Sequence, residues 1–120
     1  MWNTGFQIQN NIFINNTTKC ESNPQRGRRS FVTGDYEEYA ELYFTTYGPN
    51  GRYGNVTVRG NVFVTGEEAA HAITFAAGGD TLLVTDNIFR GEVRTIATAP
   101  GCTNVVIREN IGGQPLAGRQ

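Results

Sequence analysis

The chain has 120 residues, which supports a single domain, and its formal net charge of −1 gives no basic surface for general nucleic-acid or anionic-membrane binding. Hydrophobic residues make up 38% of the chain, no apolar run reaches transmembrane length, and the first five residues lack the basic and apolar regions of a signal peptide. Fifteen glycines and recurring Asn residues favour turns and short strands over helices.

Residues 6–13 begin a pattern that returns three times along the chain. It consists of an apolar residue, any residue, an apolar residue, two polar or small residues, Asn, then Ile or Val and usually Phe. The four copies place their Asn residues at Asn11, Asn61, Asn87 and Asn110. The last two intervals are 26 and 23 positions long, which is the length of one coil in a solenoid.

The first interval is longer, because Asn11 and Asn61 are 50 positions apart. No Asn-Ile-Phe copy occurs between residues 15 and 40. We therefore predict one coil that carries a long loop insertion at about 15–40, not two coils.

Each coil is predicted to contain three short strands. The first strands are 42–46, 72–76 and 95–98; the second are 6–9, 56–59, 82–85 and 105–108; the third are 12–14, 62–64 and 88–90. In the second strands, apolar and polar residues alternate as in a half-buried strand. In the third strands the Phe should point inward, since Arg90 follows Phe89.

Only two residues separate the second strand from the third. Asn suits this turn because it tolerates a left-handed backbone, and stacked Asn side chains can hydrogen-bond from coil to coil. The sequence therefore predicts an all-β chain, a right-handed parallel β-helix of three to four coils. A β-sandwich is the rival fold, but it does not explain why the Asn-Ile-Phe element returns at coil length.

On these four Asn positions and their apolar neighbours, the chain resembles the pectate-lyase-like right-handed parallel β-helix superfamily, with its Asn-ladder repeat proteins. The resemblance covers most of the chain outside residues 15–40. It implies that residues 1–120 form one β-helix domain, either complete or part of a longer β-helix. It also implies a carbohydrate groove along the first strands and their flanking loops. Many members bind or cleave acidic polysaccharides, although fold alone does not fix activity.

Titratable residues gather in the turns that lead into the first strands. The catalytic candidates are Glu67, Glu68, His71 and Arg94, and the substrate-binding candidates are Tyr39, Glu41, Tyr43, Arg90 and Glu92. A lyase needs a base and a cation near the uronate carboxylate, while a glycosidase needs two carboxylates across a groove. Neither set matches a catalytic motif, and charged residues in surface turns are commonly just solvated.

The His, Tyr and Cys residues bear on whether the chain binds a metal, stacks on sugars or forms a disulfide. No second His or Cys stands at ligand spacing from His71, so we expect no metal site and no cofactor. Five Tyr residues between 36 and 53 would either stack on sugars or tether the insertion. Cys20 and Cys102 fall at opposite ends of the first strands, so we expect no disulfide between them.

Three functions remain open on the sequence. The first is a non-catalytic module that recognises a polysaccharide or a surface. The second is a polysaccharide lyase or glycoside hydrolase, and the third is a purely structural self-assembling unit. Neither end shows a capping helix, so we expect a homo-oligomer joined through one solenoid end. The sequence does not identify the cellular compartment, which would be extracellular or the cell surface if the chain belongs to a larger secreted protein.

Overall fold

The computed structural model describes residues 2–14, 40–44, 51–67 and 69–117, and all regular structure in these ranges is β. The strands are β1 (Trp2–Thr4), β2 (Gln7–Gln9), β3 (Ile12–Ile14), β4 (Ala40–Phe44), β5 (Arg52–Arg59), β6 (Val62–Thr65), β7 (His71–Phe75), β8 (Gly79–Thr85), β9 (Ile88–Gly91), β10 (Thr95–Thr98), β11 (Thr103–Arg108) and β12 (Gln114–Ala117). In this part of the chain no helix has the length and apolar character needed to cross a membrane.

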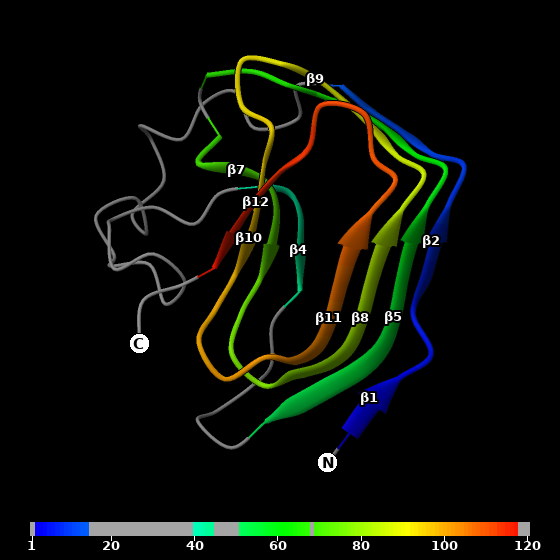
Figure 1. The fold of residues 1–120 in the computed structure, drawn as a ribbon, viewed down its shortest axis with the longest axis vertical. Coiled ribbons are helices and arrows are strands. Elements are labelled where there is room, and N and C mark those ends of the chain that lie inside the picture. The colour runs from blue at the N-terminus through cyan, green and yellow to red at the C-terminus, as the bar shows by residue number, and fades with distance from the viewer. Residues whose placement is uncertain (1, 15–39, 45–50, 68, 118–120) are drawn as a thin grey trace.

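The strands form three parallel sheets, and each strand pairs with its equivalent in the neighbouring repeat. The first sheet has the order β4-β7-β10-β12, and the third has the order β3-β6-β9. In the second sheet β1 and β2 both pair with β5, which is followed by β8 and β11, as the parallel arrows of Figure 1 show. The prediction of an all-β chain with three short parallel strands per repeat is confirmed, and the arrangement is compatible with a β-helix.

The register of the third sheet shows whether the long interval from Asn11 to Asn61 contains one repeat or two. Phe13 lies opposite Phe63, so β3 is the direct neighbour of β6. The backbone N–H of Asn11 also donates to Asn61 Oδ1 over 2.8 Å. The 50 positions between these Asn residues therefore make one repeat, as predicted. The proposed insertion itself lies outside the described residues, apart from Ala40 in β4.

Stacked aromatic rings fill the core beneath the third sheet. The ring centroids of Phe13 and Phe63 are 4.8 Å apart, and those of Phe63 and Phe89 are 4.9 Å apart, with nearly parallel planes. Phe44 and Phe75 from the first sheet stack in the same way at 5.1 Å. Inward side chains of the second sheet line up as Ile8, Val58, Val84 and Ile107. The inward position predicted for the Phe residues of the third strands and the alternation predicted for the second strands are confirmed.

The two-residue turn differs from the prediction in one respect. The left-handed residue is not the repeated Asn but the residue before it: Asn10, Gly60, Asp86 and Glu109 have φ between 58° and 70°. This leaves the side chain of the following Asn free to turn inward, because its own backbone stays in the ordinary region. Asn61 and Asn87 are each only 1% exposed.

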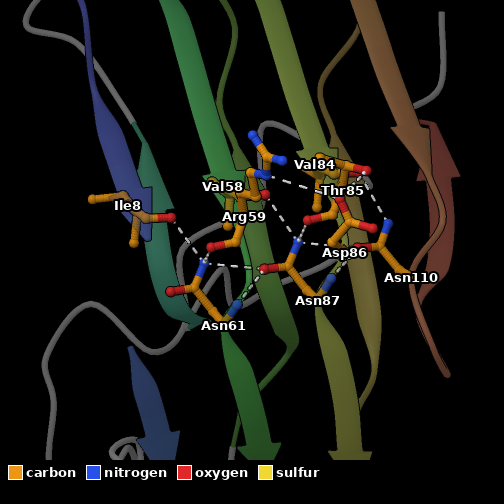
Figure 2. Close-up of polar contacts among 9 residues, drawn as sticks. All are labelled: Ile8, Val58, Arg59, Asn61, Val84, Thr85, Asp86, Asn87 and Asn110. Atoms are coloured by element: carbon orange, nitrogen blue, oxygen red, sulfur yellow. Dashed lines mark hydrogen bonds and ion pairs between the residues drawn. The ribbon is translucent and has the colours of Figure 1, made fainter. Parts of the chain in front are cut away.

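These inward Asn side chains form a hydrogen-bonded ladder (Figure 2). The backbone N–H and Nδ2 of Asn61 donate to Asn87 Oδ1 at 2.9 and 3.0 Å, and those of Asn87 donate to Asn110 Oδ1 at the same distances. Nδ2 of Asn87 also donates to the carbonyl of Val58 in the previous repeat. The ladder thus supplies partners for polar groups buried at the corner.

The second strands are longer than predicted. β5, β8 and β11 each begin before their predicted segment and continue through one residue with positive φ, namely Asn55, Thr81 and Asn104. Register aligns these three residues across the sheet. Left-handed backbone kinks a strand and marks its start as a turn in the sequence, which is why the first half of each strand was missed.

The chain ends also differ from the prediction. No strand was predicted beyond residue 108, but β12 pairs with β10 and adds a strand to the first sheet. At the opposite side of the stack, the Phe6 ring packs edge-on against Phe44 with centroids 6.1 Å apart.

We predict that Phe63→Ala lowers the free energy of unfolding by about 3–5 kcal/mol, because a ring held between two others leaves a cavity that cannot collapse. Urea unfolding measures the loss, and Phe6→Ala, at a ring 38% exposed, is the matched control with a smaller loss. A loss below about 1 kcal/mol for Phe63→Ala would contradict the stacked core.

We also predict that Asn87→Ala costs at least about 3 kcal/mol, since each buried polar group left without a partner costs about 1–3 kcal/mol. The change removes the acceptor of Asn61 and the donor to Val58 together. Asn11→Ala at the exposed end of the ladder is the control and should cost less than half as much. Equal losses for the two variants in urea unfolding would show that the ladder adds nothing specific.

Candidate functional site

The turns before the first sheet stack against one another. The backbone N–H groups of Glu92 and Val93 donate to the Thr65 carbonyl at 2.9 and 3.2 Å, and Gln114 N–H donates to the Arg94 carbonyl at 2.9 Å. The exposed side chains gathered along this side are Glu67, Arg90, Glu92 and Arg94, which we call the turn edge. The candidates Glu68 and Tyr39 lie outside the described residues.

The side chain of His71 is not exposed beside the residues of the turn edge. It starts β7 beside Ala40 of β4 and is only 6% exposed, whereas Glu67 is exposed. The structure therefore does not place this catalytic candidate at the surface. A solvent-filled groove would not reach the His71 imidazole in this conformation.

The outer face of the first sheet, where a carbohydrate groove was expected, is largely covered. Every residue of β7 is buried, and Ala72, Thr74 and Ala97 have no exposed surface. Among the binding candidates on β4, Tyr43 remains 39% exposed and Glu41 is partly buried. The centre of this face is thus closed to a ligand, and Tyr43 stands at its accessible margin.

The outer face of the second sheet is open, and the sequence reading did not consider it. We call it the second-sheet face; its side chains come from β2, β5, β8 and β11, which lie side by side in Figure 1. One row across the strands contains Gln7, Thr57, Leu83 and Val106, of which Thr57 and Leu83 are partly buried. Another contains Gln9, Arg59, Thr85 and Arg108, of which Thr85 is buried. Neighbouring strands are about 4.8 Å apart, so these groups repeat at that interval.

One cluster on this face is held by hydrogen bonds between side chains. Asp80 Oδ1 accepts from Thr103 Oγ1 at 2.6 Å and from Asn104 Nδ2 at 2.8 Å. On the other side of Asp80 the neighbouring residue of β5 is Gly54, which has no side chain. The cluster therefore presents a carboxylate that is fixed on one side and accessible on the other.

The hydrogen bonds also set the charge of this cluster. The bond from Thr103, followed by the bond from Asn104, lowers the pKa of Asp80 below its usual 3.8, and Arg52 acts in the same direction. At neutral pH Asp80 is thus a fixed anion that accepts hydrogen bonds and takes up protons poorly. The signal that could have located the cluster is Asp80, Thr103 and Asn104 at matching places in successive second strands.

Two further residues are structural. Tyr53, one of the five tyrosines expected either to stack on sugars or to tether the insertion, lies in the core and donates its hydroxyl to the Ala76 carbonyl at 2.5 Å. Cys102 contacts the same carbonyl through Sγ at 3.4 Å, and burial raises the pKa of its thiol. Its thiolate is therefore scarce at neutral pH, which makes it a poor nucleophile. Cys20 lies outside the described residues.

A metal centre has no support in the described part of the chain, where no three His, Cys, Asp or Glu side chains are grouped to hold an ion. What the exposed groups can do is donate and accept hydrogen bonds beside small apolar patches. That chemistry suits recognition of a polyhydroxylated ligand.

We predict that the Asp80 carboxyl titrates below 3.8 and that Thr103→Val raises its pKa towards the usual value. Because folding lowers this pKa, the ionised form stabilises the fold at pH above the unfolded value, and that contribution disappears as pH falls through the folded value. NMR titration of the Asp80 side-chain carbon in the unchanged protein and in the variant measures both values. An Asp80 pKa unchanged by Thr103→Val would refute the hydrogen-bonded cluster.

Comparison of the chain with protein-family models, with curated proteins and with solved structures finds no match. The resemblance to the pectate-lyase-like superfamily is therefore an expectation from the repeat alone.

Proposed function

We propose that the chain is a right-handed parallel β-helix that binds a polysaccharide on its second-sheet face without cleaving it. The handedness follows from the general rule that a connection between parallel strands of one sheet crosses over in the right-handed sense. Successive strands of every sheet here are parallel and separated by the other two strands of the repeat. Such a stack extends one flat face over several repeats.

The observation that supports sugar binding is the hydrogen-bonded Asp80 cluster on a sheet that also carries Leu83 and Val106. A sugar ring offers hydroxyl groups at its rim and C–H groups on its faces. The Asp80 carboxylate and the Asn104 amide suit the hydroxyls, while Leu83 and Val106 on the same face suit the C–H surface. Because hydrogen bonds already hold the cluster, little side-chain entropy is lost when a ligand binds.

The protonation state of the cluster favours binding over cleavage. A general acid or base works best when its pKa is near the operating pH. The pKa of Asp80 is lowered instead, so its carboxylate is a stable acceptor. The repeated rows of Thr, Gln and Arg on the same face would let an extended chain contact several repeats at once.

A second candidate places an acidic polysaccharide on the turn edge, as a lyase or hydrolase would. The stacking of Glu92 and Val93 on Thr65 favours it, because this contact brings Arg90 and Arg94 to the side of the molecule that carries Glu67. Arginine pairs well with uronate carboxylates, and a nearby Glu would serve as base. The two candidates predict different sensitive residues.

We predict that Asp80→Ala weakens binding of a neutral or acidic polysaccharide about tenfold or more, since a hydrogen bond to a charged group contributes about 1.5–3 kcal/mol. Affinity electrophoresis against a panel of polysaccharides finds the ligand, and calorimetry measures the change. The double variant Arg90→Ala/Arg94→Ala is the control and should bind as the unchanged protein does.

The same samples distinguish the two candidates. No new reducing ends and no ultraviolet absorbance of unsaturated uronates should form during long incubation. Product formation that Arg90→Ala/Arg94→Ala abolishes would replace the proposal with the lyase or hydrolase on the turn edge. Binding that is unaffected by Asp80→Ala would remove the second-sheet face as the site.

A further inference from the structure

The outer face of the third sheet is aliphatic over the whole stack of repeats. Ile12, Val62, Ile88 and Ile111 follow one another in register, one from each repeat. A shorter column beside it contains Ile14 and Val64. Together these six side chains form what we call the aliphatic stripe.

The stripe is on the outside of the molecule. Ile12, Ile14 and Ile111 are 69%, 60% and 67% exposed, while the alternating residues Phe63 and Phe89 are buried. Single exposed aliphatic residues are ordinary on a protein surface, but an aligned group from four repeats marks an interaction site. Val62, Val64 and Ile88 between them are partly buried, so the stripe is most exposed at its two ends.

Charges on the two sides of the stripe indicate what covers it. In the segment from Asp86 to Arg90, Ile88 is the central residue, with an exposed acid two positions before it and an exposed base two positions after it. A twofold axis that runs along the stack through the Ile88 column brings Arg90 of one copy opposite the partner's Asp86, and the reverse pair forms by symmetry. The face is thus complementary to itself in both shape and charge.

We propose that the aliphatic stripe is the contact surface of a homodimer in which a second copy of this chain packs face to face, with the β9 strands antiparallel. In the repeat before, the same operation places Val64 over the partner's Gly60, so an aliphatic side chain meets a residue without one. Asp86 also lies 3.9 Å from Arg59 at the surface, and such an exposed pair exchanges partners at little cost.

The size of the stripe sets the strength of the dimer. The two columns are about 7 Å apart; the longer one extends over three strand spacings of about 4.8 Å each, and the shorter one extends over a single spacing. That area is smaller than the roughly 800 Å² per partner of a standard stable interface. The dimer is therefore weak and depends on concentration.

The ladder argues against the end-to-end homodimer expected from the sequence. Its direction is fixed, because the Oδ1 of each Asn accepts from the Asn of the preceding repeat. In the described residues it begins with the acceptor Asn11 Oδ1 and ends with the donor N–H of Asn110. Joining two like ends would place acceptor against acceptor or donor against donor, whereas the aliphatic stripe needs no such match.

Sedimentation equilibrium from low to high micromolar concentration tests the proposal with the full chain. The unchanged protein should dimerise reversibly. The double variant Ile14→Lys/Ile111→Lys should raise the dimer dissociation constant at least about tenfold, since each substitution occurs twice in a symmetric interface. Both side chains are mostly exposed, so the fold should persist, and urea unfolding checks that it does.

Charge reversal gives a second readout. Arg90→Glu should weaken the dimer by placing it opposite the partner's Asp86, and Arg90→Glu/Asp86→Lys should restore it. Position 86 accepts a long side chain, because Glu109 occupies the same turn position with φ of 59°. Leu116→Lys, at an exposed residue of β12 outside the stripe, should leave the dissociation constant unchanged.

Three results would overturn the proposal. They are a strict monomer at high micromolar concentration, a dimer that is insensitive to Ile14→Lys/Ile111→Lys, and a dimer that Leu116→Lys abolishes. The last result would move the contact towards the β12 end. None of these outcomes depends on whether a polysaccharide binds the second-sheet face.

Discussion

The hydrogen bonds of the Asn side chain at the corner of each repeat are the interaction on which the rest of the structure depends. A two-residue turn between the second and third strands exposes backbone groups inside the bend, where water has no access. The side chain of Asn61 or Asn87 provides an acceptor for the preceding repeat and a donor to the strand carbonyls there. Because the Asn-to-Asn bonds and the bonds to the Ile8 and Val58 carbonyls join adjacent repeats, the ladder fixes the register of neighbouring repeats as well as their separation.

With the register fixed at the corner, the remaining columns follow from the strand period of two. Phe63 lies on the inner side of β6 and stacks on Phe13 and Phe89, while Val62 and Val64 lie on the outer side. The same alternation in β5 sends Val56 and Val58 inward. A one-residue slip would exchange the inside and outside sets, and it would also break the ladder. Core and surface are therefore specified together.

The sequence was sufficient to predict what repeats. The Asn-Ile-Phe element, the inward columns and the single long first repeat all depend on residues that recur with the same neighbours. It was insufficient for features that depend on conformation or on distant packing. The left-handed Thr81 splits one strand into what reads as a turn and a strand. His71 and Thr74 have polar side chains that suggest exposure, yet their strand is buried on both faces. The Asp80 cluster brings together residues 23 and 24 positions apart, which no local pattern reveals.

The direction of the ladder has a consequence for how such a protein changes during evolution. Every junction between repeats presents the same donors on one side and the same acceptor on the other. Duplication or deletion of a whole repeat therefore creates a junction with no unmatched group inside the corner. Differences in repeat length, from 23 to 50 positions, arise elsewhere, in connections outside the ladder. A change in repeat number would thus leave the corner bonds matched, whereas replacing the Asn of one inner corner removes bonds at two junctions at once.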